Sequence, residues 1–279
     1  MVWKCGAFRL SLARPLVMGV VNVTPDSFSD GGKFFDATAA RAQAQRLIEE
    51  GADIIDIGGE STRPGAAAVP VDEEKLRVVP LVEALRDSKV AISVDTSQPE
   101  VMRAALNAGA AIINDVRALQ MPGALETAAA SDCGVVLMHM QGTPQTMQDN
   151  PRYDDVVVEV ADFLRQRRAA AVAAGIALDR IALDPGFGFG KTIEHNYRLL
   201  GHLREVAALD APLLIGISRK GMLKKATGRS VGGRAVASAA AALIAVQGGA
   251  HIVRVHDVAA TRDALAVWRM TREFSGERQ

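Results

Sequence analysis

Short apolar runs recur along the chain at nearly regular intervals, and polar residues follow each of them. Eight runs have the length and the β-branched residues typical of buried strands: 16–21, 53–57, 90–94, 111–113, 134–138, 181–183, 213–217 and 251–255. Between them lie segments with helical periodicity. In 154–174, Val156, Val160 and Leu164 fall on one face, and Gly175 is typical of a helix end. The pattern predicts strands that alternate with helices.

This alternation favours a (β/α)8 TIM barrel, an α/β fold in which parallel strands are enclosed by helices. The core of the barrel is expected at about 16–268, within one domain that spans 1–279. An open, doubly wound sheet is the alternative. That fold normally carries a glycine-rich phosphate loop after its first strand, and the segment Asn22-Val23-Thr24-Pro25 is not such a loop.

Polar residues stand at the end of every predicted strand. In chain order they are Asn22, the segment 58–65, Asp95, Asn114 with Asp115, His139, Asp184, the segment 218–220 and the segment 254–257. One such residue alone is commonly a turn or capping residue. In a barrel, however, the ends of all eight strands meet on one face, which is where barrel enzymes have their active sites. We therefore expect a functional site there.

The chemistry of these residues falls into two groups. Carboxylates, an amide and an ammonium group suit a flat heterocycle with donor and acceptor edges: Asp95, Asn114, Asp184 and Lys220. Hydroxyl, guanidinium and imidazole groups suit an anion such as phosphate or diphosphate: Thr62, Arg63, Arg254 and His256. The predicted site thus binds a ring and an anion together.

Composition narrows the class of protein. The chain has 279 residues, 32 Lys plus Arg and 32 Asp plus Glu, so its formal charge is zero and nothing favours nucleic-acid binding. Cys5 and Cys133 lack metal-type spacing and are expected to be free thiols, which makes the cytoplasm the default location. No apolar run is long enough to predict a membrane span.

Three motifs suggest other chemistry but do not match the sequence patterns which that chemistry requires. The segment GFGFGKT at 186–192 is one residue too short between its glycines for a P-loop. His251 and His256 have no partner at zinc-binding spacing, and Ser218 lacks the setting of a hydrolase nucleophile. None of the three therefore predicts a nucleotide, zinc or hydrolase site.

From about Leu16 to Trp268 the chain resembles the bacterial dihydropteroate synthases of the pterin-binding family. The shared motifs are NVTPDSFSDGG at 22–32, GGESTRPGA at 58–66, SVDT at 93–96, IIND at 112–115, MHMQGTP at 138–144, LDPGFGFGK at 183–191, SRK at 218–220 and RVHD at 254–257. The resemblance implies a (β/α)8 barrel, usually a homodimer, that joins a dihydropterin methyl diphosphate to 4-aminobenzoate in folate biosynthesis.

The resemblance also implies a role for each site residue. The pterin would be held by Asp95, Asn114, Asp184 and Lys220, and the diphosphate by Thr62, Arg63, Arg254 and His256. Asn22 would ligate a Mg²⁺ cofactor. The walls of the benzoate pocket would be Phe28, Pro64 and Phe189, with Pro25 and Asp26 from the first loop. Arg63, Lys220, Arg254 and His256 are the expected catalytic residues.

One departure and two alternatives accompany the resemblance. Many members of the family have a serine after the SRK lysine, whereas this chain has Gly221, so we expect activity with weaker 4-aminobenzoate binding. One alternative function is a methyltetrahydrofolate-dependent methyltransferase domain with a corrinoid partner. The other is a catalytically silent pterin-binding protein. The helices expected at 235–247 and 259–268 are candidates for the dimer surface.

Overall fold

A parallel sheet of eight strands forms the centre of the molecule and closes on itself. The computed structural model describes residues 1–23, 37–61, 65 and 68–275. The strands are β3 (Leu16–Asn22), β4 (Ile54–Gly58), β5 (Ala91–Asp95), β6 (Ile112–Asp115), β7 (Gly134–Met138), β8 (Ile181–Asp184), β9 (Leu214–Ile215) and β10 (Ile252–Val255). Their order is β8-β7-β6-β5-β4-β3-β10-β9, and a bridge between Leu183 and Leu213 joins the two edges. The predicted (β/α)8 barrel is confirmed.

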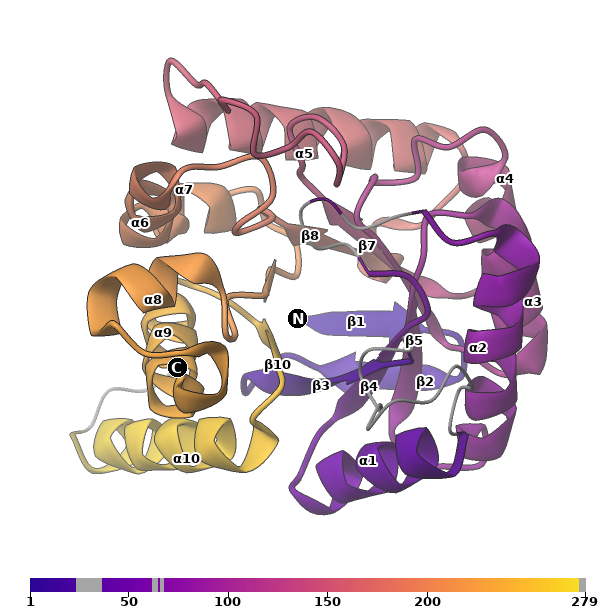
Figure 1. Cartoon of the computed structure of the whole chain (residues 1–279), viewed down its shortest axis with the longest axis horizontal. Coiled ribbons are helices and arrows are strands. Elements are labelled where there is room, and N and C mark those ends of the chain that lie inside the picture. Colours follow the sequence, from indigo (N-terminus) through magenta and orange to yellow (C-terminus); the bar gives the residue numbers. More distant parts are fainter. Residues whose placement is uncertain (24–36, 62–64, 66–67, 276–279) are drawn as a thin grey trace.

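Helices surround the barrel on its outside (Figure 1). They are α1 (Ala37–Glu49), α2 (Val71–Leu85), α3 (Pro99–Ala108), α4 (Ala124–Ala129), α5 (Val156–Ala173), α6 (Ile193–Gly201), α7 (Leu203–Ala207), α8 (Gly221–Thr227), α9 (Ala235–Gln247) and α10 (Val258–Ser275), with short 3₁₀ turns at Leu178–Arg180 and Val231–Gly233. Within the described ranges, no helix has the length and apolarity to cross a membrane.

Alternate residues of each strand serve two different cores. Val17, Val21 and Ile55 pack outward against the helices, whereas Met18 and Ile54 belong to a second cluster inside the barrel. Both faces of the strands are therefore buried, which explains why the strands are almost continuously apolar in sequence. A polar residue at one of the alternate positions that share the inward direction of Met18 and Ile54 therefore lies inside the barrel.

An antiparallel hairpin seals the barrel at the end where the strands begin. It consists of β1 (Val2–Cys5) and β2 (Phe8–Ser11), and it lies behind the barrel strands in the view of Figure 1. Trp3 and Cys5 are fully buried within the inner cluster, and the Trp3 indole donates to the Arg180 carbonyl at 2.9 Å. The sequence pattern did not predict this hairpin, so the ordered fold begins before the expected core.

The element boundaries differ from the predicted ones mainly where a strand leaves the barrel. The strand expected at 213–217 is reduced to β9, because the chain departs at Gly216 into the loop that carries Lys220. Helix α5 begins after Asp155, whose carboxylate accepts hydrogen bonds from two backbone N–H groups of the first turn. Helix α9 has the predicted bounds, and α10 continues to Ser275, beyond the expected 259–268.

Candidate active site at the mouth of the barrel

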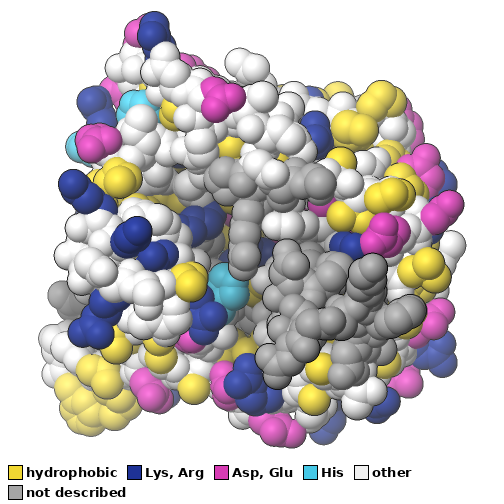
Figure 2. Space-filling view, in the orientation of Figure 1, with side chains coloured by type: hydrophobic (Ala, Val, Ile, Leu, Met, Phe, Trp, Pro, Cys, Tyr) yellow, Lys and Arg dark blue, Asp and Glu magenta, His cyan; other side chains and the backbone are white. Residues whose placement is uncertain are grey.

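The carboxyl ends of the strands surround a hollow on one face of the molecule. Figure 2 shows this face, with basic and histidine side chains beside the hollow on the side of α8. Asp95 ends β5, Asn114 lies in β6, Asp184 ends β8, and Lys220 immediately precedes α8. The structure therefore brings the predicted ring-binding residues to one end of the barrel.

Arg254 lies between two aspartates inside the barrel. Its Nε donates to Asp56 Oδ2 at 2.6 Å, and one terminal nitrogen donates to Asp95 Oδ2 at 2.8 Å. Asn114 Nδ2 also donates to Asp56 Oδ2, at 3.2 Å. Arg254 thus forms part of the wall of the ring pocket in addition to carrying the positive charge expected for a diphosphate. Asp56 was not among the predicted site residues.

Burial shifts the ionisation of the groups in this pocket. It raises the pKa of Asp95 and of Asp184, and the positive charges of Arg254 and Lys220, respectively, oppose that rise. Burial lowers the pKa of Lys220 to about 8, with Asp184 acting in the opposite direction. At neutral pH Lys220 is therefore mainly a cation that gives up its proton more readily than an exposed lysine.

The loop after β8 packs closely against the loop after β7. Gly186 and Gly190 have positive φ, and a Cβ atom on them would lie 1.8 Å from the His139 carbonyl oxygen and 2.4 Å from that of Gln141. The buried Lys191 ammonium donates to the carbonyls of Gly186 and Phe189 at 3.0 and 3.1 Å. The glycines of this loop thus serve close packing, which agrees with the rejection of a P-loop.

Two of the polar residues at strand ends support loops instead of facing a ligand. The Asp115 carboxylate accepts from the Ser97 hydroxyl and from the backbone N–H groups of Arg117 and Leu119. His139 Nδ1 lies 2.8 Å from Lys191 Nζ, and burial lowers the pKa of His139 to about 2. His139 is therefore neutral and accepts a hydrogen bond from the lysine.

His256 is also neutral at physiological pH, because burial and the nearby Arg254 lower its pKa to about 4. The Ser218 hydroxyl oxygen accepts from the His256 backbone N–H and lies 3.0 Å from His256 Nδ1. This hydroxyl can donate to Nδ1, and in that tautomer the ring proton is on Nε2. His256 can offer an anion a hydrogen bond, but it brings no positive charge.

The two histidines of the last strand do not form a metal pair. His251 precedes β10 at the opposite end from His256, and its Nδ1 accepts from the Leu213 backbone N–H at 3.2 Å. No group of three His, Cys, Asp or Glu residues in the described part of the chain could hold a metal ion.

Asn22 provides an amide group at the barrel mouth. Its Oδ1 lies 3.6 Å from the position that a Cβ on Gly58 would take, which is an ordinary van der Waals distance, so Asn22 lies directly beside the end of β4. One neutral oxygen is a poor site for a transition metal, but it fits Mg²⁺, which retains waters and takes phosphate oxygens as ligands. Asn22 is therefore compatible with the predicted role.

Several predicted residues lie outside the described part of the chain, namely Pro25, Asp26, Phe28, Thr62, Arg63 and Pro64. The remaining wall residue, Phe189, lies beside Lys220, whose Nζ is 4.4 Å from the centre of its ring. Lys220 Nζ also donates to the Phe187 carbonyl. Lys220 therefore adjoins both the expected ring pocket and the expected benzoate pocket.

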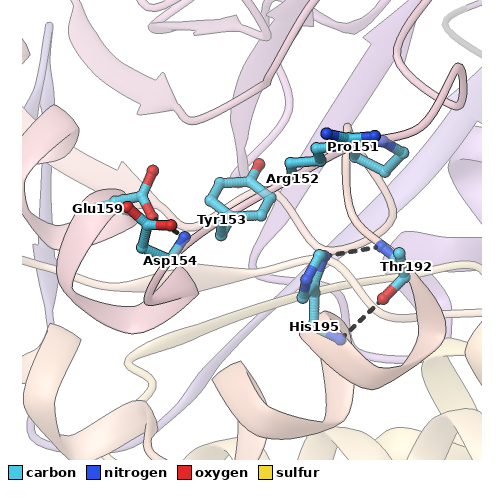
Figure 3. Close-up of a pocket in the computed structure, with 7 residues that line it drawn as sticks. All are labelled: Pro151, Arg152, Tyr153, Asp154, Glu159, Thr192 and His195. Atoms are coloured by element: carbon cyan, nitrogen blue, oxygen red, sulfur yellow. Dashed lines mark hydrogen bonds between the residues drawn. The ribbon is translucent and has the colours of Figure 1, made fainter.

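A second hollow lies between the starts of α5 and α6 (Figure 3). It is lined by Pro151, Arg152, Tyr153, Asp154, Glu159, Thr192 and His195. Thr192 and His195 cap α6 reciprocally, and the Tyr153 hydroxyl donates to the Gly190 carbonyl at 2.7 Å. These side chains therefore support the loop after β8 from outside the barrel.

A (β/α)8 barrel with charged and amide side chains gathered at the carboxyl ends of its strands has the arrangement of a barrel enzyme. The family described as pterin binding enzyme matches residues 18–256, which is most of the chain. The chain belongs to this family and, within it, to the dihydropteroate synthases.

The relatives support this assignment over nearly the full length. The dihydropteroate synthase of Haemophilus influenzae is 53% identical over 263 residues, which cover 94% of this chain and 96% of the relative. The structure of the Xanthomonas albilineans enzyme with 4-aminobenzoic acid has a TM-score of 0.92 at 54% identity, covering 97% and 98% of the two chains. The Burkholderia cenocepacia enzyme complexed with 7,8-dihydropteroate has a TM-score of 0.91 at 50% identity, covering 99% and 98%.

Proposed function

We propose that this chain condenses (7,8-dihydropterin-6-yl)methyl diphosphate with 4-aminobenzoate in a Mg²⁺-dependent reaction of folate biosynthesis. The products are 7,8-dihydropteroate and diphosphate. The observation that carries this proposal is the convergence of Asp95, Asn114, Asp184 and Lys220 on the pocket that Arg254 lines. The ligands of the two solved relatives, 4-aminobenzoic acid and 7,8-dihydropteroate, support it further.

The pterin would enter the barrel with its ring edges toward these residues. One Asp184 oxygen accepts from the Gly186 N–H at 2.7 Å, so the carboxylate is fixed and its other oxygen can accept from the amino edge of the ring. Lys220 can donate to the opposite, acceptor edge. A pocket that offers both donors and acceptors selects a pterin over a ring that lacks either edge.

The reaction breaks the bond between the pterin methylene carbon and a diphosphate oxygen. Asn22 would hold Mg²⁺ at the diphosphate, and the bound ion would supply positive charge that stabilises the leaving group. Arg63 and Thr62 would bind the same anion. His256 would donate one hydrogen bond from Nε2, and the guanidinium of Arg254 would add positive charge.

The amine of 4-aminobenzoate then forms the new carbon–nitrogen bond, and its proton leaves to the diphosphate or to solvent. A neutral aniline is nucleophilic without a general base, so the absence of an activated histidine among the described residues is no obstacle. Phe189 would form one wall for the benzoate ring, with Phe28 and Pro64 as others. Lys220 beside Phe189 would place positive charge near the reacting groups.

The enzyme is proposed to act as a homodimer through α9 and α10, which pack on each other. Several of their large apolar side chains are exposed: Val236, Ile244, Val267, Met270 and Phe274. Figure 2 shows hydrophobic side chains gathered over the carboxyl end of α10. A second copy would cover them. Sedimentation of the Val267→Asp variant tests this, because a monomeric wild type, or a variant that stays dimeric, contradicts it.

The first test mixes the purified chain with both substrates, with and without Mg²⁺, and follows dihydropteroate and diphosphate. Formation of both only with Mg²⁺ is expected. The Asp184→Asn variant should lose most of this activity while remaining folded. Binding of the pterin without either product would contradict the proposal and favour the methyltransferase or the silent binding protein.

A further inference from the structure

Asp56 is a buried acid in the middle of an otherwise apolar strand. It lies in β4 with the same inward parity as Ile54, in register with Val20 on one side and Ser93 on the other. Its side chain is fully buried. A carboxylate in such a place costs stability unless its neighbours compensate for the lost hydration.

The neighbours that compensate for it belong to the pterin site. Both Arg254 Nε and Asn114 Nδ2 donate to the same oxygen, Oδ2, at 2.6 and 3.2 Å. The bond to Asn114 fixes the orientation of that amide, because its NH₂ group is directed at Asp56 and its carbonyl oxygen is turned away. The bond to Arg254 fixes the plane of the guanidinium that also contacts Asp95.

The placement of Asp56 beside Ser93 lowers the stability of the fold. Asp56 Oδ1 and Ser93 Oγ are buried, and neither has a hydrogen-bond partner among the described residues. A buried polar atom without a partner is costly, so a strand selected only for stability would place apolar residues at both positions. The acid is therefore better explained by what it does to Arg254 and Asn114.

We propose that Asp56 is a positioning residue of the pterin site, which orients the amide of Asn114 and the guanidinium of Arg254 toward the ring. This inference rests on the proposed function. It assigns Asp56 no contact with the reacting atoms. Asn114 then presents its carbonyl oxygen as an acceptor to an N–H group of the ring. Arg254 stays beside the ring, and Asp95 binds the ring.

The test compares two aspartates of the same segment. Asp53 precedes β4 at the closed end of the barrel, where its carboxylate pairs with Arg14 and Arg262. Asp53→Asn and Asp56→Asn each remove one carboxylate charge paired with arginine, but only the second is at the pterin site. Each variant is compared with the wild type for KM of both substrates and for binding of 7,8-dihydropterin by calorimetry.

In Asp56→Asn, we expect the KM for the pterin diphosphate and the dissociation constant of 7,8-dihydropterin to rise about tenfold, the usual effect of losing one charge-assisted hydrogen bond. The KM for 4-aminobenzoate should stay unchanged. Asp53→Asn should leave all three constants unchanged. Unaltered pterin constants in a folded Asp56→Asn protein, or an equal rise in Asp53→Asn, would overturn the inference.

Two further measurements keep the test decisive. If Asp56→Asn does not fold, Asp56→Glu is measured in the same way, and wild-type pterin affinity in it would count against a positioning role. A double-mutant cycle with Asn114→Ala should show non-additive losses of pterin affinity, and additive losses would contradict the inference. Failure of the proposed function is distinguishable, because then the wild type itself forms no dihydropteroate.

Discussion

At the closed end of the barrel the inward side chains are apolar and close packed, whereas at the open end they are charged and hydrogen bonded. Trp3 of the hairpin packs at the closed end with Met18 and Ile54 of the barrel strands. Asp56, Asp95 and Arg254 occupy the open end. The same strands thus carry both environments, within only a few residues of one another.

The difference between the two ends is also a difference in how completely polar atoms are paired. Among the described residues, the buried side-chain atoms without a hydrogen-bond partner belong to Asp56, Ser93 and Glu74. The first two lie inside the barrel beside the pocket, and Glu74 packs against Gly59 in the loop after β4. The closed end therefore stabilises the fold, whereas the unpaired polar atoms near the open end lower its stability.

The largest effect on stability is expected from a substitution in the apolar packing of the closed end. Trp3→Ala removes a fully buried indole and its hydrogen bond to Arg180. It should lower the free energy of unfolding by about 3–5 kcal/mol, measured by urea denaturation. Below the unfolding transition, kcat/KM per folded molecule should not change. A loss of activity in fully folded protein would show that the two ends are not independent.

At the open end, Lys220→Met should lower kcat/KM for the pterin diphosphate by about 100-fold, because a charged donor to the ligand is lost. The thermal midpoint should change little, since the methionine side chain fills the space of the half-buried lysine. The pKa of Lys220 is lowered to about 8, so it is charged below that pH and neutral above it. Wild-type kcat/KM should therefore decline above about pH 8, and the decline should be absent in the variant.

Glu74→Gln tests the cost of an unpaired acid near the open end. Burial raises the pKa of Glu74 from 4.5 to about 7. Because the folded state binds the proton more tightly than the unfolded chain, stability falls as pH rises from about 4.5 to about 7, by at most about 3 kcal/mol. Unfolding measured against pH should show a flatter curve in the variant. Glu83→Gln, which changes an exposed acid of the same helix, serves as the control and should keep the wild-type curve.

The smallest effect concerns Gly221. A Cβ atom there would meet nothing within 4 Å, so a serine fits without displacement of a neighbour. Gly221→Ser should lower the KM for 4-aminobenzoate about threefold, through one added hydrogen bond to the carboxylate. Gly221→Ala serves as the control, because it adds the Cβ without the hydroxyl. Equal KM values in the two variants would show that the hydroxyl has no such role.

The sequence alone predicted the barrel and most of its mouth for a simple physical reason. Parallel strands end on one face, so residues such as Asp95 and Asp184 could be brought together without knowledge of distances. Asp56 was missed because it precedes the end of its strand, although it shares the inward parity of Ile54. The pairing of Arg254 with both acids depends on contacts across the barrel, which no local pattern contains.

The hairpin that closes the barrel also has a consequence for folding on the ribosome. Its partners are synthesised much later than the hairpin itself, since Trp3 donates to the carbonyl of Arg180 and Gly6 to that of Asp132. These contacts between distant parts of the chain are slow to form. The hairpin must therefore wait, with its indole unburied, until the chain has been synthesised as far as β8.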